Sequence, residues 1–436
     1  MNHISKIYRP QTVLGKTKGV ALAKNQNLLI EHGLMKHMAK GIYYYLPLLQ
    51  RSIEKTSKLI SQFMNRIDAQ QVTIPTLTPA NLWKDSGRFA QYEDVLFLTK
   101  DKTQHDLLLG PTFEEAIAKM LAFTGSSIGE DQLPLRFYQI GNKFRDEARP
   151  RYGLIRSREF IMKDLYTFDI DKEHAMQTYN EISEIYLKLF KFLGIPFTKV
   201  EAEAQEMGGH LSHEYHYMNQ IGEEKLLTCL NCGHSMKDTE TYEPKCANCS
   251  GTSFESHQGI EVAHTFYLGD TFTKQLEANY VSAARKVKSM EMGCHGIGVT
   301  RLIGASIECL STDVHLRWPF PIAPFSVCII PPEKRSKAFT TASHYLDEVY
   351  HNLNALPGLQ NDVVVDDRIK LTPNDRIRQA KRIGIPLIVI IGKKACDPEN
   401  VLFELYITQE DKTCFLPMNA LIAEISKVVQ KYNVEL

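Results

Sequence analysis

The sequence lacks a long apolar run and an excess of charge of either sign. None of its hydrophobic stretches approaches the roughly eighteen consecutive apolar residues of a membrane-spanning helix, so we expect no transmembrane segment and no membrane partner. The 51 lysines and arginines balance 51 aspartates and glutamates, which leaves no formal net charge. A nucleic-acid partner therefore cannot be inferred from total charge, and would have to be recognised by local clusters.

A disulfide framework is also missing. Disulfide-rich secreted domains are short and carry paired cysteines, whereas this chain has an odd number, nine, in 436 residues. This distribution favours a reducing compartment. The chain is long enough for two or three domains, each with its own core. Five of the cysteines are scattered: Cys294, Cys309, Cys328, Cys396 and Cys414.

The first thirty residues contain no acidic residue, and the first acid is Glu31. A basic segment without acids is typical of organellar transit peptides. We therefore expect residues 1–25 to be a mitochondrial leader and the protein to lie in the mitochondrial matrix. The alternative is a short basic tail on a cytosolic protein. The basic residues of this segment are Lys6, Arg9, Lys16, Lys18 and Lys24.

Two domains are expected along the chain. From Leu46 to Arg66, apolar residues recur at helical spacing with charges between them, which predicts an amphipathic helix. The helix leads into a short strand broken by Pro75, and strands then alternate with helices to about residue 320. Three prolines in "RWPFPIAPF", residues 317–325, predict a domain boundary. We place the first domain at residues 26–320 and the second at residues 325–436.

The second domain alternates strands and helices. Such alternation predicts a small α/β domain with a largely parallel sheet. The expected strands are residues 326–331, 362–367 and 385–394, and the expected helices are residues 336–354 and 373–384.

A highly charged loop joins two strand-like segments of the first domain. The stretch from Phe144 to Asp169, "FRDEARPRYGLIRSREFIMKDLYTFD", begins and ends in segments rich in aromatic and branched residues. Alternate residues of a strand share a face, so Arg145 and Glu147 are expected to point the same way. Arginine binds phosphate, a carboxylate accepts from an amine or helps to hold magnesium, and an aromatic ring stacks on a base. The hairpin thus predicts a nucleotide site; the alternative is a surface hairpin with ordinary ion pairs.

Two further motifs have both a structural and a functional interpretation. In "MGCHGIGVTRLIGASIE", residues 292–308, glycines lead into an apolar helix from which Arg301 would project towards a ligand. The structural alternative is a tight turn with a solvated arginine. In "LLLGPTFEEAI", residues 107–117, Thr112 and Glu115 have the spacing of a helix capping box, and we expect a capped helix start.

Four cysteines lie at the spacing C-x2-C-x13-C-x2-C, in a segment that we place at residues 225–255. This spacing is typical of a zinc ribbon, although its central spacer is slightly short, and it predicts a structural zinc site. The alternative is four reduced thiols in a knuckle without metal. A catalytic zinc is not expected because four cysteine ligands leave no open coordination position. The four residues are Cys229, Cys232, Cys246 and Cys249.

Together these motifs resemble the class II aminoacyl-tRNA synthetases and, in detail, the prolyl-tRNA synthetases. The charged hairpin is similar to motif 2 of that class, and residues 292–301 to motif 3. "GPTFEE" resembles the Thr-x-Glu loop of the family, with Phe113 where a histidine is usual. The strand "GIEVAHTFYLG", 259–269, resembles the amino-acid pocket strand, with Ala263 where a glycine is usual. The likeness runs from about residue 25 and is greatest to the animal mitochondrial form.

The resemblance implies a fold, partners and a reaction. The fold would be an α+β catalytic domain, an antiparallel sheet flanked by helices, followed by a C-terminal α/β anticodon-binding domain. The helix 46–66 and Pro75 resemble motif 1, which forms the homodimer interface of this class. The implied reaction activates L-proline with ATP and Mg²⁺, and transfers it to tRNA(Pro). Only about 120 residues separate motifs 2 and 3, so we expect no editing domain.

The resemblance also assigns roles to residues. Arg145 would bind the α-phosphate of ATP and the carbonyl end of proline, and Glu147 would bind the adenine amino group. Phe160 and Arg301 would enclose the adenine ring, and Arg156 belongs to the same ATP site. Arg145, Glu147 and Arg301 would be the catalytic residues. The proline site would consist of Thr112 and Glu114 at the amino group, Arg145 at the carboxyl end, and Phe168, His264, Phe266 and Cys294 around the ring.

Two other functions are considered. A threonyl enzyme of the same subclass would need metal ligands in its pocket to recognise a hydroxyl group, whereas the pocket strand here is mostly apolar. A non-catalytic synthetase-like accessory subunit would be expected to lose Arg145, Glu147 or Arg301, and all three are present.

Overall fold

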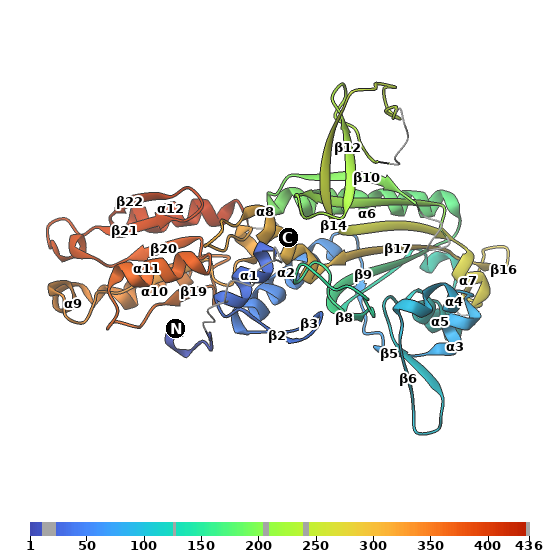
Figure 1. Ribbon diagram of the computed structural model, residues 1–436, viewed down its shortest axis with the longest axis horizontal. Helices are drawn as coiled ribbons and strands as arrows, with labels where there is room; N and C mark the ends of the chain where they lie inside the picture. Colours follow the sequence, from blue (N-terminus) through green and yellow to red (C-terminus); the bar gives the residue numbers. More distant parts are fainter. Residues whose placement is uncertain (11–22, 125–127, 204–208, 239–243, 433–436) are drawn as a thin grey trace. The chain divides into compact units, whose positions relative to one another are not determined.

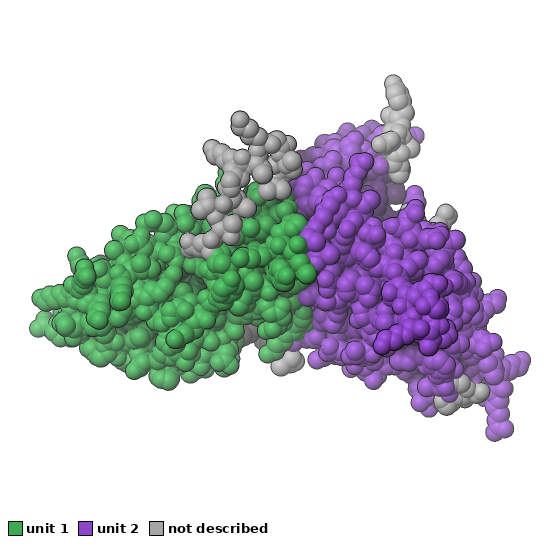
Figure 2. Space-filling view, turned by 60° about the horizontal axis from the view of Figure 1, so that its bottom comes forward, with its two compact units in different colours: residues 1–38, 43–59, 306–436 green, residues 39–42, 60–305 purple. Residues whose placement is uncertain are grey.

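The computed structural model describes residues 1–10, 23–124, 128–203, 209–238 and 244–432. The chain divides into two compact units, which are coloured separately in Figure 2. The larger unit comprises residues 39–42 and 60–305, and the smaller unit comprises residues 1–38, 43–59 and 306–436. Among the described residues, no helix combines the length and the apolar character needed to cross a membrane.

The larger unit is built on a nine-stranded sheet in the order β10–β11–β14–β17–β9–β8–β4, with β12 and β13 attached beside β14. Its neighbouring strands are antiparallel except β4 and β8, which are parallel. The expected antiparallel sheet is thus confirmed. The strands are β4 (Gln70–Gln71), β8 (Leu135–Phe144), β9 (Glu159–Asp169), β10 (Phe197–Ala202), β11 (Leu211–Met218), β12 (Glu224–Cys229), β13 (Ser235–Lys237), β14 (Phe254–Gly269) and β17 (Glu291–Gly298).

One face of this sheet is covered by the long helix α6 (Lys172–Leu193), as Figure 1 shows. The helix begins where the Asp171 side chain accepts a hydrogen bond from the backbone N–H of His174, and it ends at Gly194 in the left-handed conformation. Its buried side includes Tyr186 and Phe190, which are fully buried. The helix therefore supplies the core on the side of the sheet away from the candidate site.

The opposite face of the sheet packs against short helices and carries the candidate site. A hydrophobic cluster on this face joins α5 (Glu114–Thr124) and α7 (Thr271–Gln275) to β9 and β17. A three-stranded sheet in the order β5–β7–β6 lies in the same unit. The strands of this small sheet are β5 (Leu77–Pro79), β6 (Phe97–Lys100) and β7 (Asp106–Leu109). Other helices and strands of the larger unit are α3 (Ala80–Asp85), α4 (Phe89–Tyr92), β15 (Asn279–Val281) and β16 (Val287–Ser289).

The smaller unit holds a six-stranded sheet in the order β1–β19–β18–β20–β21–β22. Strands β19, β18 and β20 are parallel, which confirms the expected α/β domain, whereas β20, β21 and β22 are antiparallel. A short turn at residues 408–411 joins β21 to β22, and such a connection allows only antiparallel pairing. The strands are β1 (Asn2–His3), β18 (Val327–Ile330), β19 (Val363–Val365), β20 (Leu387–Ile390), β21 (Phe403–Ile407) and β22 (Lys412–Leu416).

The helices of the smaller unit follow the predicted order with one difference. The single helix expected at residues 336–354 is two helices, α9 (Lys337–Ala342) and α10 (Tyr345–Asn354). The helix expected at residues 373–384 is α11 (Pro373–Arg382), whose cap is the Thr372 side chain. The remaining helix of the C-terminal segment is α12 (Met418–Gln430).

The N-terminal segment contributes to the smaller unit. Strand β1 pairs in parallel with β19, and the backbone N–H of Ser5 donates to Asp367 over 2.9 Å. The helix expected at residues 46–66 is α2 (Pro47–Asn65), and its Ser52 hydroxyl donates to the carbonyl of Ile322. The expected leader and domain boundaries stay predictions; residues 11–22 of that leader lie outside the described residues. The other α-helices and strands of the described residues are α1 (Lys24–Glu31), β2 (Met35–Ala39), β3 (Ile42–Tyr45) and α8 (Val299–Leu310).

Candidate active site

The charged hairpin of the sequence is β8 and β9, joined by a loop at residues 145–158. The strand pairing ends at Phe144, so Arg145 and Glu147 lie in the loop. The expectation that they share one face of a strand is therefore wrong. The loop is held at its base because the backbone N–H of Arg145 donates to the carbonyl of Arg158 over 2.9 Å. Arg145 and Glu147 nevertheless line one cavity.

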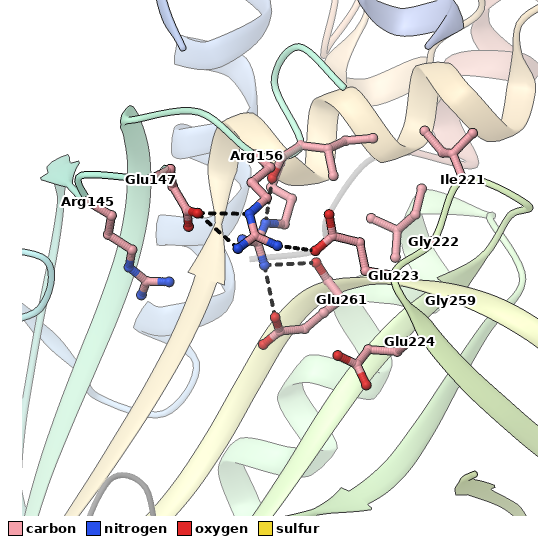
Figure 3. A pocket seen from close by; sticks show the side chains of 12 residues that line it. Arg145, Glu147, Arg156, Ile221, Gly222, Glu223, Glu224, Gly259 and Glu261 are labelled. Carbon is pink, nitrogen blue, oxygen red and sulfur yellow. Dashed lines mark hydrogen bonds and ion pairs between the residues drawn. The ribbon is translucent and has the colours of Figure 1, made fainter. Parts of the chain in front are cut away.

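That cavity has a volume of about 200 Å³ and is rich in charged groups. Figure 3 shows charged side chains from the motif 2 loop and from strand β14 gathered around it. The opposite charges at its wall make it suited to a ligand that carries both phosphates and hydrogen-bonding groups. Its lining residues are Arg145, Glu147, Ile155, Arg156, Ile221, Gly222, Glu223, Glu224, Gly259, Ile260, Glu261 and Arg301.

Arg156 lies between two carboxylates of this cavity, as Figure 3 shows. Its guanidinium donates to Glu147 over 2.9 Å and to Glu223 over 2.5 Å. Arg151 reaches the other oxygen of Glu223 over 2.7 Å. Burial by itself raises the pKa of Glu223, but the two arginines outweigh it and lower that pKa. The loop arginines are thus bound by the turn that precedes β12.

Arg145 and Arg301 are placed by aromatic and carboxylate partners. The guanidinium carbon of Arg145 lies 5.3 Å from the centre of the Phe160 ring. Arg301 donates to Glu261 over 2.9 Å and to the carbonyl of Ile155 over 3.0 Å. Burial and the nearby charge of Arg301 lower the pKa of Arg145. With Glu147 and Arg156, the residues Arg145, Phe160 and Arg301 make up the five that the resemblance assigns to ATP, and the structure adds Glu261 as a partner of Arg301.

The expected proline-binding residues lie on the same face of the sheet. Phe266 pairs with Cys294 across β14 and β17, and directly paired residues of neighbouring strands share a face. The rings of His264 and Phe266 stack with their centres 3.8 Å apart. Gly296 pairs with His264, and a Cβ at this glycine would lie 3.5 Å from the sulfur of Met162. Phe168 is fully buried and contributes to the hydrophobic cluster on this face.

Glu114 is the most tightly held acid of this region. One carboxylate oxygen accepts from the Thr112 hydroxyl over 2.6 Å and from the Cys294 thiol over 3.0 Å. The other accepts from Arg88 over 3.1 Å. Burial raises the pKa of the Cys294 thiol well above its usual value, so the thiol keeps its proton and serves as the donor. Thr112, Glu114 and Cys294 are therefore brought together as predicted.

One expectation about this region is wrong, and the structure places the two residues that depart from the family pattern, Ala263 and Phe113. The capping box does not form: Glu115 accepts from Ser86 and Arg88 instead of turning back to the helix start, because buried donors outcompete a local contact. Ala263 pairs with Ile297 and alternates with His264, so it lies on the face of the sheet away from the proline-binding residues. Phe113 is buried in the core, where its ring faces Gly110.

Two groups of side chains have the arrangement of a metal site within the described residues. The sulfurs of the cysteine box lie within 4.8 Å of one another, and those of Cys229 and Cys249 are 3.6 Å apart. A tetrahedral zinc with Zn–S bonds of about 2.3 Å requires sulfurs about 3.8 Å apart, so the box fits this ion. The second group consists of Glu214, Glu261 and His264, beside the cavity.

Sequence reasoning did not single out three charged residues of the site. Glu223 and Glu261 line the cavity, and Arg88 binds Glu114. Glu261 had a signal, because it is an acid in a strand of mainly apolar and aromatic residues. Arg88 and Glu223 had none, because each is defined by partners that are distant in the chain.

Family models match both halves of the chain. Residues 97–309 match the tRNA synthetase class II core domain (G, H, P, S and T), and residues 326–427 match the anticodon binding domain. A probable mitochondrial proline–tRNA ligase of Homo sapiens is 38% identical over 436 residues, which cover 98% of this chain and 91% of the human protein. A proline–tRNA ligase of Ehrlichia canis is 34% identical, covering 91% of this chain and 93% of that protein.

Solved structures have the same fold. The prolyl-tRNA synthetase of Cryptosporidium parvum, complexed with halofuginone and AMPPNP, superposes with a TM-score of 0.76 at 17% identity, covering 94% of this chain and 75% of that one. The Giardia lamblia prolyl-tRNA synthetase, in complex with prolyl-adenylate, has a TM-score of 0.76 at 18% identity, covering 92% and 76%. Together with the curated relatives and the two family models, this shows that the chain belongs to the prolyl-tRNA synthetases, class II enzymes that ligate proline to tRNA.

Proposed function

We propose that this chain carries out both steps of proline ligation at the site on the active face of its large sheet. In the first step, a carboxylate oxygen of proline attacks the α-phosphorus of ATP, and pyrophosphate leaves. In the second, a ribose hydroxyl of the terminal adenosine of tRNA(Pro) attacks the carbonyl carbon of prolyl-adenylate, and AMP leaves. The observation that carries this proposal is the meeting of three arginines with Glu147 in one cavity, in the unit that also holds the buried Glu114.

The chemistry needs positioning and charge stabilisation, and it needs no protein nucleophile. Arg145 would bind the α-phosphate and the carbonyl end of proline, and Glu147 would accept from the adenine amino group. Phe160 and Arg301 would enclose the adenine ring. Arg145 lies over Phe160 in this structure, so Arg145 must turn from the ring to the phosphate when adenine stacks there.

The secondary ammonium group of proline would bind Thr112 and Glu114. Glu114 is ionised here because Arg88 and its other donors outweigh the effect of burial on its pKa, which is lowered. The ring of proline would lie against His264 and Phe266, with Cys294 and Phe168 behind them. These are mostly apolar neighbours, and they suit a saturated five-membered ring.

Two metal ions fit the side chains present. Glu261 and Glu214 offer hard carboxylate oxygens at the cavity, and they would hold the Mg²⁺ that accompanies ATP, which neutralises charge on the phosphates. The cysteine box would hold one structural Zn²⁺.

We further propose that the enzyme is a homodimer of the mitochondrial matrix without an editing domain. Between β9 and β17, the described residues consist of α6, α7 and strands of the synthetase fold with the cysteine box. Proline and alanine differ by little apolar surface, so pocket binding discriminates between them only modestly. Deacylation of alanyl-tRNA(Pro) by the purified chain would overturn the proposed lack of editing.

Amino-acid-dependent ATP–pyrophosphate exchange, measured with each of the twenty amino acids, tests the function. We expect exchange with proline and weak exchange with alanine. Exchange with another amino acid alone would overturn the assigned substrate. Binding of nucleotide without any exchange would favour a non-catalytic accessory subunit.

A further inference from the structure

A buried arginine lies behind the amino-group site. Arg88 is 6% exposed, and its guanidinium carbon lies 4.8 Å from the ring centre of Trp83 and 4.7 Å from that of Tyr92. Its Nη1 donates to Glu114 over 3.1 Å and to Glu115 over 3.0 Å. The aromatic rings fix the plane of the guanidinium, so both carboxyl groups meet one nitrogen in a defined direction.

Two buried acids thus share one positive charge, and their surroundings differ. Glu114 accepts from Thr112, Cys294 and Arg88, so both of its oxygens have donors. Glu115 accepts from Ser86 and Arg88 on one oxygen only, and its other oxygen has no hydrogen-bond partner among the described residues. A buried carboxylate oxygen without a donor is costly, whereas a carboxylic acid carries its proton there.

The electrostatic balance agrees with this difference. Burial and the nearby Glu114 raise the pKa of Glu115. Burial also acts on Glu114, but Arg88 and the other donors overcome it and lower the pKa of Glu114. Of the two acids, Glu115 is thus the one that its surroundings favour in the protonated form, and Glu114 is the one that they favour as the anion.

We propose that Arg88 is a positioning residue for proline recognition: it aims the Glu114 carboxylate at the secondary ammonium of proline, while Glu115 remains a neutral acid that leaves the charge of Arg88 to Glu114. This rests on the proposed role of Glu114. A single oriented carboxylate lets the site recognise the ammonium without reorganisation on binding. Arg88 itself acts only through Glu114.

The substitution Arg88→Lys tests the positioning role, because lysine keeps the charge but loses the planar, ring-stacked group. We expect the KM for proline in pyrophosphate exchange to rise about tenfold or more, with the KM for ATP changed less than about twofold. Cyclopentanecarboxylate, which has the ring and the carboxylate of proline but no nitrogen, serves as a competitive inhibitor. Its Ki should not change, since it makes no ammonium contact; an equal weakening of proline, the inhibitor and ATP would overturn the proposal.

The substitution Glu115→Gln tests the neutral acid. Glutamine has the shape of a protonated glutamate, so we expect the KM for proline to change less than about threefold, while Glu114→Gln raises it strongly. Arg88→Lys should add little when combined with Glu114→Gln, because the same contact is already lost. If Glu115→Gln costs as much as Glu114→Gln, the proposal is wrong.

Two controls separate the possible failures. If Arg88→Lys does not fold, Arg88→Gln in the Glu115→Gln background removes the charge without leaving an ionised Glu115, and it provides the same comparison of proline with the inhibitor. If wild type shows no exchange with proline, or Glu114→Gln leaves the KM for proline unchanged, the proposed function or the role of Glu114 fails. If both hold and the Arg88 variant binds proline normally, only this inference fails.

Discussion

The proposed role of Arg156 in ATP binding requires its present partners to change. Glu147 and Glu223 both bind it, and Glu223 also binds Arg151. A phosphate group that is to bind Arg156 must compete with Glu223. The Arg156–Glu223 ion pair is partly exposed to solvent, so breaking it costs no more than about 1 kcal/mol.

The variant Glu223→Gln should therefore lower the KM for ATP, by up to about fivefold. The neighbouring Glu224→Gln is the matched control, because Glu224 lines the same cavity but pairs with Lys237. Pyrophosphate exchange at varied ATP concentration measures both. A higher KM for ATP in Glu223→Gln would mean that Glu223 holds the loop in its binding form instead of competing with ATP.

Asp169 gives a pH-dependent prediction at the end of β9. Burial raises its pKa to about 6, against a small opposing effect of its hydrogen bond from Thr178. The pKa of Asp169 is higher in the folded state than in the unfolded state, so the ionised carboxylate destabilises the fold. This cost is present in full above about pH 6, and it is absent below about pH 4, where both states are protonated. Its second oxygen has no hydrogen-bond partner among the described residues.

We expect Asp169→Asn to raise the free energy of unfolding at pH 7.5 by up to about 3 kcal/mol, and to lose this gain as the pH falls from 6 to 4. Asparagine can still accept from Thr178, so the packing is kept. Urea unfolding across this pH range measures the effect. The exposed Asp131→Asn is the control, expected within about 0.5 kcal/mol of wild type, and equal stabilisation by Asp169→Asn at pH 4 and 7.5 would contradict the mechanism.

Four of the residues that the resemblance assigns to ATP, Arg145, Glu147, Arg156 and Arg301, line one cavity. Arg145, Glu147 and Arg301 belong to local motifs whose chemistry is legible in the sequence. The partners of Arg88 and Arg156 could not be predicted, because Glu114 is 26 and Glu223 is 67 residues away from them in the chain. Only the folded sheet brings such residues within hydrogen-bonding distance.

At the scale of elements, the cysteine box ends the hairpin that frames the cavity. Strand β12 begins at Glu224, beside the cavity, and ends at Cys229, the first cysteine of the box. The sulfurs of Cys232 and Cys246 are 3.6 Å apart, as are those of the other pair. A bound zinc would thus hold the outer end of β12 and β13.

We expect the purified chain to hold one zinc per chain, measured by elemental analysis. Cys249→Ser should lose zinc and speed amide hydrogen exchange in β12 and β13, while α6 keeps its protection, because the ion links only the tip of the hairpin. Cys396→Ser, outside the box, is the control. Full protection of β12 in a chain without zinc would show that the knuckle is stable without metal.

At the scale of the whole molecule, the likeness of α2 and Pro75 to motif 1 predicts a dimer. Closed two-fold dimers are the commonest soluble oligomers, and a motif shared by both copies gives a self-complementary surface. Light scattering after size exclusion should give twice the chain mass of 49.7 kDa across a dilution series. A mass of 49.7 kDa at all concentrations would contradict the assignment.

The sequence by itself determined the reaction class and the two folds, because local motifs carry their chemistry in residue types at short spacing; the ATP ligands that it implies stay predictions. It also predicted a capped helix at Thr112, which the structure replaces by tertiary contacts of Glu115. Only the tertiary structure decided which residues support the site. Arg88 binds Glu114, and Glu223 binds Arg156, across segments that are distant in the chain. No local sequence pattern encodes these two ion pairs.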